Sequence, residues 1–249
     1  MPGGSACLII TAVSSDDVRA IGRAAGFAAL CAVIVSLLAL VVRERADALV
    51  GFDESAVRAG TDYSRSHPVL LQALIAWQWA TQPKFVYLLA VPVTAWAARS
   101  RRTRSRLRTR AAWAFVTMML VWSLAGLMKE IVQRARPIVA DPVSHASGYS
   151  FPSGHSANAM AAALVMVVLW WPLLSRGGRW AAVLLAVAFV VITGADRVLL
   201  GVHYPSDVAG GFVLGAAMVT ASYRAFRSRR APVSGGDTRS SPSTSNRVG

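Results

Sequence analysis

The sequence predicts an all-α integral membrane protein, a bundle of six transmembrane helices with a polar site at the outer membrane–water interface. Of its 249 residues, 55% are hydrophobic and only 15% are charged, which is too apolar for an ordinary soluble domain. The hydrophobic residues are gathered in blocks about as long as a bilayer core requires. Arginines are concentrated between the blocks, at positions that an alternating path through the membrane places on one side. These three observations predict the fold class.

Six apolar blocks are the expected membrane spans. They cover residues 24–42, 83–98, 111–127, 156–174, 181–195 and 208–223. The second block is short, because Gln82-Pro83-Lys84 interrupts a longer apolar stretch. We therefore interpret residues 69–80 as an interfacial helix or as the outer part of the same crossing. The spans form one domain, residues 24–224, which contains all the motifs described below.

The segments outside the spans are polar. Residues 1–23 lack the features of a secretory signal, so we expect a cytoplasmic N-terminal segment there. Residues 43–67 mix both signs of charge and predict a hydrated loop or a surface helix. Residues 225–249 are rich in Ser, Gly, Pro, Thr and Arg, which predicts a disordered basic cytoplasmic tail. Cys7 and Cys31 have no evident partner, so we expect no disulfide.

The formal net charge of +14 comes from arginines near the expected span ends and in the tail. The densest run, residues 99–110, should be cytoplasmic by the positive-inside rule, and so should both termini. This parity places residues 129–155 and 196–207 together on the outer face of the plasma membrane. We expect the basic loop and tail to meet anionic lipid headgroups. Nucleic acid is not an expected partner, because no basic and aromatic residues interleave on one surface. The sequence does not indicate an oligomeric state.

A short loop before the fourth span carries the strongest chemical signal. It reads Phe151-Pro152-Ser153-Gly154-His155, and a helix that begins at Ser153 points unpaired N–H groups and its positive dipole end at Gly154. Ser153 can cap that helix or donate its hydroxyl, Gly154 lets an oxyanion approach the backbone, and His155 can give a proton. The loop predicts an anion-binding site.

Each polar residue near the span ends also has an ordinary explanation when it is considered alone. Basic side chains such as Lys129, Arg136 and Arg197 reach from span ends to the interface. Tyr204-Pro205-Ser206-Asp207 makes a good helix start, and Asp207 favours the helix dipole there. His67 and His145 have no motif around them and are expected to be loop residues. The functional interpretation depends on the conjunction of the motifs.

Three motifs stand at residues 129–137, 152–155 and 197–207. Lys129 is followed seven residues later by Arg136 and Pro137; Pro152-Ser153-Gly154-His155 comes next; Arg197 is followed by His203 and Asp207. Together they resemble the three-part signature of the type 2 phosphatidic acid phosphatase superfamily. One position departs from the pattern, because Asp196 stands where many members carry Ser. An extra carboxylate there could weaken the pull of Arg197 on phosphate or orient its guanidinium.

The resemblance implies a phosphoryl-transfer site, and the residue types fit that chemistry. Lys129, Arg136 and Arg197 would neutralise the phosphoryl oxygens, with Ser153 and Gly154 as neutral donors. His203 would attack phosphorus and form a phosphohistidine. Asp207 would orient His203, and His155 would act as general acid and then as general base. The scheme requires neither a metal nor another cofactor.

The expected activity is hydrolysis of a lipid phosphate monoester or diphosphate by a membrane phosphatase whose substrate enters from the bilayer. Isoprenoid diphosphates of cell-wall carrier recycling, phosphatidic acid, phosphatidylglycerol phosphate and diacylglycerol diphosphate are candidates, and the outward-facing site favours the isoprenoid carrier. Two alternatives remain open. One is an enzyme that resembles the vanadate-dependent haloperoxidases of the same superfamily, and the other is a non-catalytic lipid-binding or transport protein with a relic site.

Overall fold

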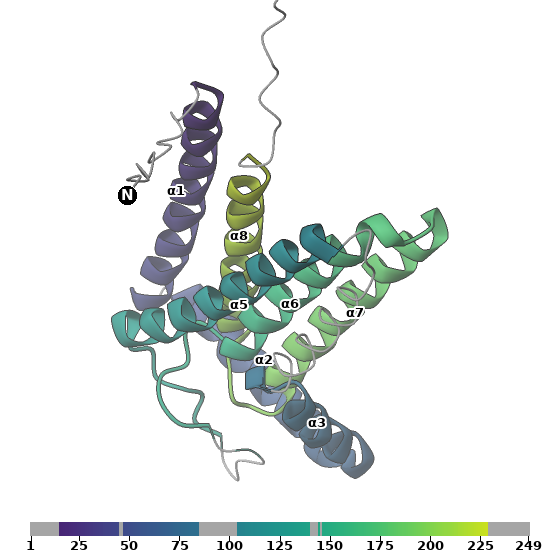
Figure 1. Ribbon diagram of the computed structural model, residues 1–249. Helices are drawn as coiled ribbons and strands as arrows, with labels where there is room; N and C mark the ends of the chain where they lie inside the picture. Colours follow the sequence, from purple (N-terminus) through teal and green to yellow (C-terminus); the bar gives the residue numbers. More distant parts are fainter. Residues whose placement is uncertain (1–14, 45–46, 85–103, 140–143, 145, 229–249) are drawn as a thin grey trace, which may run out of the picture.

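The computed structural model describes residues 15–44, 47–84, 104–139, 144 and 146–228, and this part of the chain is helical with irregular connections (Figure 1). The long helices are α1 (Ser15–Arg43), α5 (Arg104–Val132), α6 (Gly154–Trp170), α7 (Arg176–Leu199) and α8 (Pro205–Ser228). The remaining elements are α2 (Asp47–Ser66), α3 (Pro68–Ala80) and the 3-10 turn η1 (Trp171–Leu173).

Four helices in the described part of the chain are long and apolar enough to cross a membrane. These spans are Thr109–Val132, Gly154–Leu173, Arg176–Leu199 and Pro205–Arg227, and they correspond to the third to sixth predicted spans. The end of α1 adds a shorter apolar stretch, Ala32–Arg43, within the first predicted span. The second predicted span, residues 83–98, lies almost wholly outside the described residues. The described part of the chain is therefore all-helical with four candidate spans, and the count of six stays a prediction.

Helix α6 lies at the centre of the bundle and packs against α5, α7 and α8, while α1 lies alongside α8 (Figure 1). Two glycines of α8 permit the closest of these approaches. A Cβ atom on Gly211 would lie 2.6 Å from the carbonyl oxygen of Ser153, and one on Gly215 would lie 2.5 Å from that of Ala157. The start of α6 is thus held directly against the backbone of α8.

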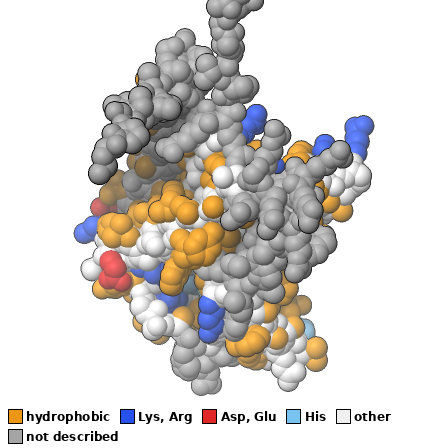
Figure 2. All heavy atoms as spheres, viewed as in Figure 1, with side chains coloured by type: hydrophobic (Ala, Val, Ile, Leu, Met, Phe, Trp, Pro, Cys, Tyr) orange, Lys and Arg blue, Asp and Glu red, His pale blue; other side chains and the backbone are white. Residues whose placement is uncertain are grey.

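The outer surfaces of α5 and α7 are apolar, as lipid contact requires. On α7, Leu184 is 67% exposed and Leu185 is 71% exposed, and on α5 Phe115 and Trp122 are also exposed. Figure 2 shows one face of the molecule, where hydrophobic side chains gather in a central patch and Lys and Arg side chains lie around it. Large exposed apolar surfaces are unfavourable in water, so these side chains require a bilayer or another apolar surface around them.

Residues 47–66, where we predicted a loop or a surface helix, form the helix α2. Four side chains face inward from it, namely Asp53, Val57, Thr61 and Ser64, and all are buried. Helix α2 packs against α7 and α8, and α3 packs against α7, where Trp77 Nε1 donates to Thr193 Oγ1 at 3.2 Å. The predicted interfacial helix at residues 69–80 is therefore a helix, and it packs against α7 and α2 (Figure 1).

Several boundaries differ from prediction because helices continue beyond their apolar blocks. Lys129 lies in the last turn of α5, and Asp196 and Arg197 lie in the last turns of α7 rather than in loops. Helix α1 begins at Ser15, inside the predicted N-terminal segment, and α8 continues to Ser228, into the predicted tail. Residues 1–14 with Cys7, the arginines of residues 99–103, His145 and residues 229–249 lie outside the described part.

Candidate active site

The loop with Ser153 and Gly154 forms the predicted helix start. Helix α6 begins at Gly154, and Ser153 is its N-cap, with its Oγ accepting from the Ser156 amide at 3.4 Å and from the Ser156 hydroxyl at 2.9 Å. The amides of Gly154 and His155 have no acceptor within the helix, as at any helix start. A Cβ atom on Gly154 would meet nothing within 4 Å, so the backbone there is open to an anion.

The first motif is fixed on the loop that precedes α6. Lys129 Nζ donates to the carbonyl of Tyr149 at 2.6 Å, and Arg136 Nε donates to the carbonyl of Gly148 at 2.9 Å. Arg136 Nη2 donates to Ser147 O at 3.0 Å. Lys129 and Arg136, separated by the end of α5, thus converge on one short stretch of backbone beside the second motif.

The third motif joins both of the others. Arg136 Nη1 donates to the carbonyl of Val202 at 2.7 Å and lies 3.3 Å from His203 Nε2. The Ser153 amide donates to the carbonyl of Asp207 at 2.9 Å. Hydrogen bonds therefore link all three motifs, although 78 residues separate Lys129 from Asp207.

The contacts of His203 determine its tautomer. A guanidinium can only donate, so Nε2 beside Arg136 is the ring nitrogen with the lone pair. The other nitrogen, Nδ1, lies 3.4 Å from Asp207 Oδ2, an ion-pair distance without a hydrogen bond, and we assign the proton to this nitrogen because it faces the carboxylate. His203 is 4% exposed. In this tautomer, the unprotonated Nε2 of His203 faces Arg136.

Burial also keeps His203 neutral. It lowers the pKa of His203 from 6.5 to about 4; Asp207 opposes the shift, while Arg136 and Lys129 add to it. A neutral ring at physiological pH is the form that can act as a nucleophile.

His155 and Arg197 complete the candidate site. His155 lies in the first turn of α6, and its Nε2 is buried without a hydrogen-bond partner among the described residues. The charges of Arg197, His203 and Lys129 all act on its ring, so these three residues lie close enough to His155 to interact with it electrostatically. Arg197 is buried at the end of α7, where its Nε donates to Asp196 Oδ2 at 2.8 Å and its Nη2 donates to the same oxygen. Asp196 therefore holds the guanidinium that we predicted to bind phosphate.

Two charged residues beside the site were missed in the sequence. Arg134 donates from Nη1 to Asp207 Oδ1 at 2.7 Å and from Nη2 to Asp53 Oδ2 at 2.7 Å. Burial alone would lower the pKa of Arg134, but Asp207 and Asp53 outweigh it and raise that pKa, so the guanidinium stays charged. Arg134 stands two positions before Arg136 in the first motif and could have been noticed. Asp53, in a stretch with no motif, offered no such signal.

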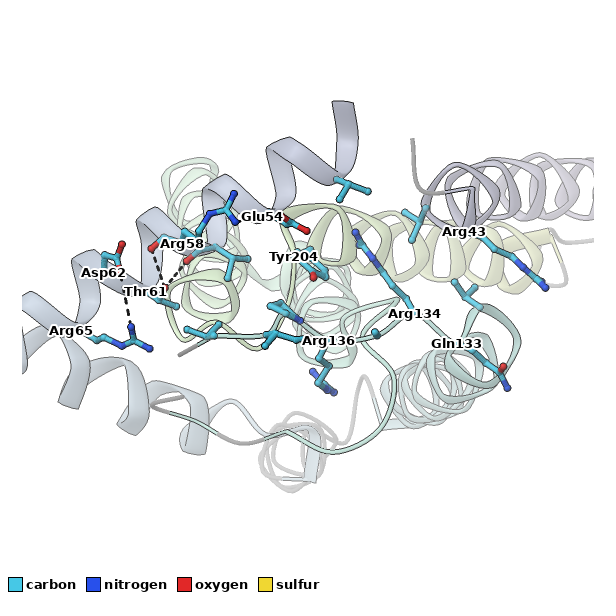
Figure 3. A pocket seen from close by; sticks show the side chains of 18 residues that line it. Arg43, Glu54, Arg58, Thr61, Asp62, Arg65, Gln133, Arg134, Arg136 and Tyr204 are labelled. Carbon is cyan, nitrogen blue, oxygen red and sulfur yellow. Dashed lines mark hydrogen bonds and ion pairs between the residues drawn. The ribbon is translucent and has the colours of Figure 1, made fainter. Parts of the chain in front are cut away.

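A cavity of about 730 Å³ lies between α2 and the segment after α5, on the side where Arg134 and Tyr204 face α2 (Figure 3). Arg134 stacks over the Tyr204 ring there, with its guanidinium carbon 4.2 Å from the ring centroid. Only Arg136 is common to this cavity and the predicted site residues. The cavity is thus adjacent to the candidate site, which we locate from the convergence of the three motifs instead.

Comparison with known proteins finds the family that the three motifs resemble. The model of the PAP2 superfamily matches residues 110–231. Phosphatidylglycerophosphatase B of Bacillus subtilis is 40% identical over 113 residues, which are 43% of this chain and 55% of that protein. Decaprenylphosphoryl-5-phosphoribose phosphatase of Mycobacterium tuberculosis strain H37Rv is 40% identical over 116 residues, 45% and 59% of the two chains. The chain thus spans somewhat more than half the length of these curated relatives.

A solved structure extends the likeness beyond the motif region. The crystal structure of a transmembrane PAP2-type phosphatidylglycerolphosphate phosphatase from Bacillus subtilis matches with a TM-score of 0.71 and 26% identity. The match covers 83% of this chain and 98% of that one. These findings confirm the resemblance that the three motifs predicted, and with the four apolar spans they make the chain a multi-pass membrane protein.

Proposed function

Since the chain belongs to the PAP2 superfamily through residues 110–231, we propose that it is a metal-independent membrane phosphatase that hydrolyses a lipid phosphate monoester or diphosphate through a phosphohistidine. One observation carries this proposal above the others. The Nε2 atom of a buried neutral His203 faces Arg136, while Nδ1 faces the Asp207 carboxylate. A nucleophilic nitrogen is therefore directed to the place where a cationic ligand would hold a phosphoryl group.

Binding would set the phosphoryl group between three cations and the start of α6. Lys129, Arg136 and Arg197 balance the negative charge that spreads over the equatorial oxygens during transfer. The Gly154 amide and the Ser153 hydroxyl add neutral donors, helped by the positive end of the α6 dipole. Because these groups are fixed by helices and backbone carbonyls, they need little rearrangement in the transition state.

The first chemical step forms the covalent intermediate. The lone pair of His203 Nε2 attacks phosphorus as the bond to the lipid oxygen breaks, and His155 gives that oxygen a proton. The ring of His203 becomes positively charged, and the Asp207 carboxylate beside Nδ1 stabilises it.

The second step reverses the proton transfer. His155, now neutral, takes a proton from water, whose oxygen attacks phosphorus and breaks the bond to His203 Nε2. Inorganic phosphate leaves, and His203 returns to the tautomer inferred from its contacts with Arg136 and Asp207. Each atom of the water molecule is accounted for, one proton on His155 and the hydroxyl in phosphate.

The alternating arginine bias supports a site on the outer face of the plasma membrane, with both termini and residues 99–110 in the cytoplasm. The lipid substrate would reach the site laterally from the outer leaflet. Anionic headgroups would contact the basic loop and tail on the opposite face.

The substrate class follows from the chemistry of the site and from the names of the relatives. Phosphatidylglycerophosphatase B, decaprenylphosphoryl-5-phosphoribose phosphatase and undecaprenyl-diphosphatase BcrC all carry names of enzymes that act on lipid phosphates. We assign this chain to the same chemical class. An isoprenoid phosphate or diphosphate is our first candidate, and phosphatidylglycerol phosphate and phosphatidic acid are the others.

The test is phosphate release by purified, detergent-solubilised protein over a panel of these lipids, with and without EDTA. We expect turnover of at least one lipid, unchanged by EDTA and inhibited by vanadate, which mimics a five-coordinate phosphoryl group. Activity that is lost in EDTA and restored by a divalent cation would contradict the metal-independent mechanism. Binding of lipid phosphates without any turnover would favour the relic-site alternative.

A further inference from the structure

The contacts of Asp207 continue away from His203 to a buried carboxylate of α2. Arg134 lies between the two carboxylates, with 2.7 Å from Nη1 to Asp207 Oδ1 and 2.7 Å from Nη2 to Asp53 Oδ2. Both carboxylates are fully buried, and the Arg134 side chain is 12% exposed. We call Asp53, Arg134 and Asp207 the buried charge triad.

Ser206 adds contacts to two members of the triad, Asp53 and Arg134. Asp53 Oδ1 accepts from the Ser206 amide at 3.0 Å, and Asp53 Oδ2 also accepts from the Ser206 hydroxyl. Arg134 Nη1 donates to the same hydroxyl at 2.6 Å. The start of α8 is thereby tied to α2 through Asp53 and to the segment after α5 through Arg134.

These contacts leave the Asp207 carboxylate one orientation. Its Oδ1 accepts from Arg134, while its Oδ2 accepts from the Tyr204 amide at 2.9 Å and faces His203 Nδ1. Rotation of the carboxylate would break the bonds to Arg134 and Tyr204 together. The oxygen that lies 3.4 Å from Nδ1 is therefore fixed, which limits how the His203 ring can turn.

We propose that Asp53 and Arg134 are positioning residues for the nucleophile, which act through Asp207 to hold His203 in the orientation and tautomer that attack requires. This inference rests on the proposed function, because it assigns roles in the same reaction. It also brings α2 into catalysis, although α2 lies outside the region that matches the family model. Neither residue touches the phosphoryl group in this scheme.

Stability alone is a weak reason for such a triad. Replacing buried charge networks with apolar groups of similar volume is often neutral or stabilising, because desolvation cancels much of the attraction. A triad with a positioning role has a different signature from a triad with a structural role. Disruption of a positioning triad should slow the chemical step and leave phosphate binding intact, because Lys129, Arg136 and Arg197 are not altered.

The experiment compares full-length Asp53→Asn, Arg134→Met and Arg134→Lys, each confirmed as folded by size-exclusion chromatography and thermal unfolding in detergent. Three quantities are measured: the single-turnover rate of phosphohistidine formation, kcat, and the competitive inhibition constant of inorganic phosphate. We expect phosphohistidine formation to slow about 100-fold in Arg134→Met and about tenfold in Asp53→Asn. The inhibition constant of phosphate should stay within about twofold of the wild-type value in both, which corresponds to a negligible change in binding.

Further variants distinguish the loss of the Arg134 geometry from the loss of its charge and from a general effect of mutating α2. Arg134→Lys keeps the charge but cannot bridge two carboxylates, so it should recover only part of the lost rate. Asp62→Asn and Arg58→Lys are the matched controls on α2, where these side chains are 76% and 69% exposed, and both should behave as wild type. The double variant Asp53→Asn/Arg134→Met should be no slower than Arg134→Met, because Asp53 acts through Arg134.

The outcomes distinguish this inference from the proposed function. If wild-type protein forms no phosphohistidine, the proposed mechanism fails, and the inference fails with it. If wild type forms it and the two triad variants form it at the wild-type rate, or weaken phosphate binding as much as they slow the reaction, only the inference is overturned. Should neither variant fold, Ser206→Ala is the substitute, because it removes one hydroxyl between Asp53 and Arg134. It must slow phosphohistidine formation by about threefold or more and leave the inhibition constant of phosphate unchanged.

Discussion

Gly211 of α8 is predicted to control the geometry of the site without belonging to it. In Gly211→Ala the new Cβ atom would lie 2.6 Å from the Ser153 carbonyl oxygen and 2.9 Å from Ser156 Cβ. An ordinary contact needs about 3.4 Å or more, so the start of α6 must move away from α8 by roughly 0.8 Å. The neighbouring hydrogen bond from the Ser153 amide to the Asp207 carbonyl joins the second motif to the third, and this movement would stretch it.

Two magnitudes follow from that displacement. Overpacking of this kind costs about 1–3 kcal/mol of stability. A displacement of about 1 Å between catalytic groups can cost roughly 100-fold in rate, and here it would separate Gly154 and His155 from His203. We therefore expect a clear fall in kcat/KM that exceeds what the loss of folded protein explains.

Gly154→Ala is the matched comparison, because it makes the same substitution where a Cβ atom would meet nothing within 4 Å. This variant should unfold at the wild-type temperature or above it. The added methyl group would stand where the anion approaches the backbone, so the inhibition constant of inorganic phosphate should rise by about tenfold, the equivalent of one hydrogen bond. Initial rates and thermal unfolding in the same detergent measure both variants. Wild-type kinetics in Gly211→Ala would refute the packing argument.

Three further predictions follow from the charge pattern, from Asp196 and from His203. Single cysteines at Arg101 and Ser147 should show opposite labelling by an impermeant thiol reagent in intact cells, with Ser147→Cys labelled and Arg101→Cys protected; the reverse pattern would overturn the topology. Asp196→Ser should lower the inhibition constant of inorganic phosphate by about tenfold, because Nε and Nη2 of Arg197 lose their bonds to the carboxylate and become available to the anion; weaker phosphate binding would show instead that Asp196 is needed to orient Arg197. The rate of phosphohistidine formation from p-nitrophenyl phosphate, corrected for substrate ionisation, should change less than about twofold between pH 7 and pH 5, because the lowered pKa of about 4 keeps His203 neutral over that range. An unshifted histidine with a pKa near 6.5 would lose about 25-fold over the same interval, and such a loss would contradict the burial argument.

The sequence was sufficient for the spans that have long apolar blocks and for the site residues that share a motif. Ser153 caps α6 as predicted, and Arg136 and His203 are in contact. Those inferences succeeded because each depends on local spacing or on a short-range helix signal. The resemblance of the three motifs to one family then supplied their convergence, which spacing within each motif cannot show.

The parts that escaped prediction depend on tertiary contacts. Asp53 has no motif neighbour, and only the packing of α2 against α8 brings it to Arg134. The bond between Asp196 and Arg197 was considered as a possibility but could not be decided, because the sequence placed both residues in a loop, where their relative orientation is not determined by spacing. Helix ends also extended past their apolar blocks, since polar residues such as Lys129 and Arg197 continue the last turns where hydrophobicity stops.

The central claim is that His203 is the nucleophile and His155 the acid and base, and the two histidines should fail differently. With 32P-labelled p-nitrophenyl phosphate, whose leaving group needs no proton, alkali-quenched wild-type protein should show an alkali-stable, acid-labile phosphohistidine in the peptide that contains His203. His155→Ala should still form this intermediate and accumulate it, because water is no longer activated, whereas His203→Ala should form none. If folded His203→Ala forms the phosphoenzyme and folded His155→Ala does not, the two roles are reversed and the mechanism is wrong.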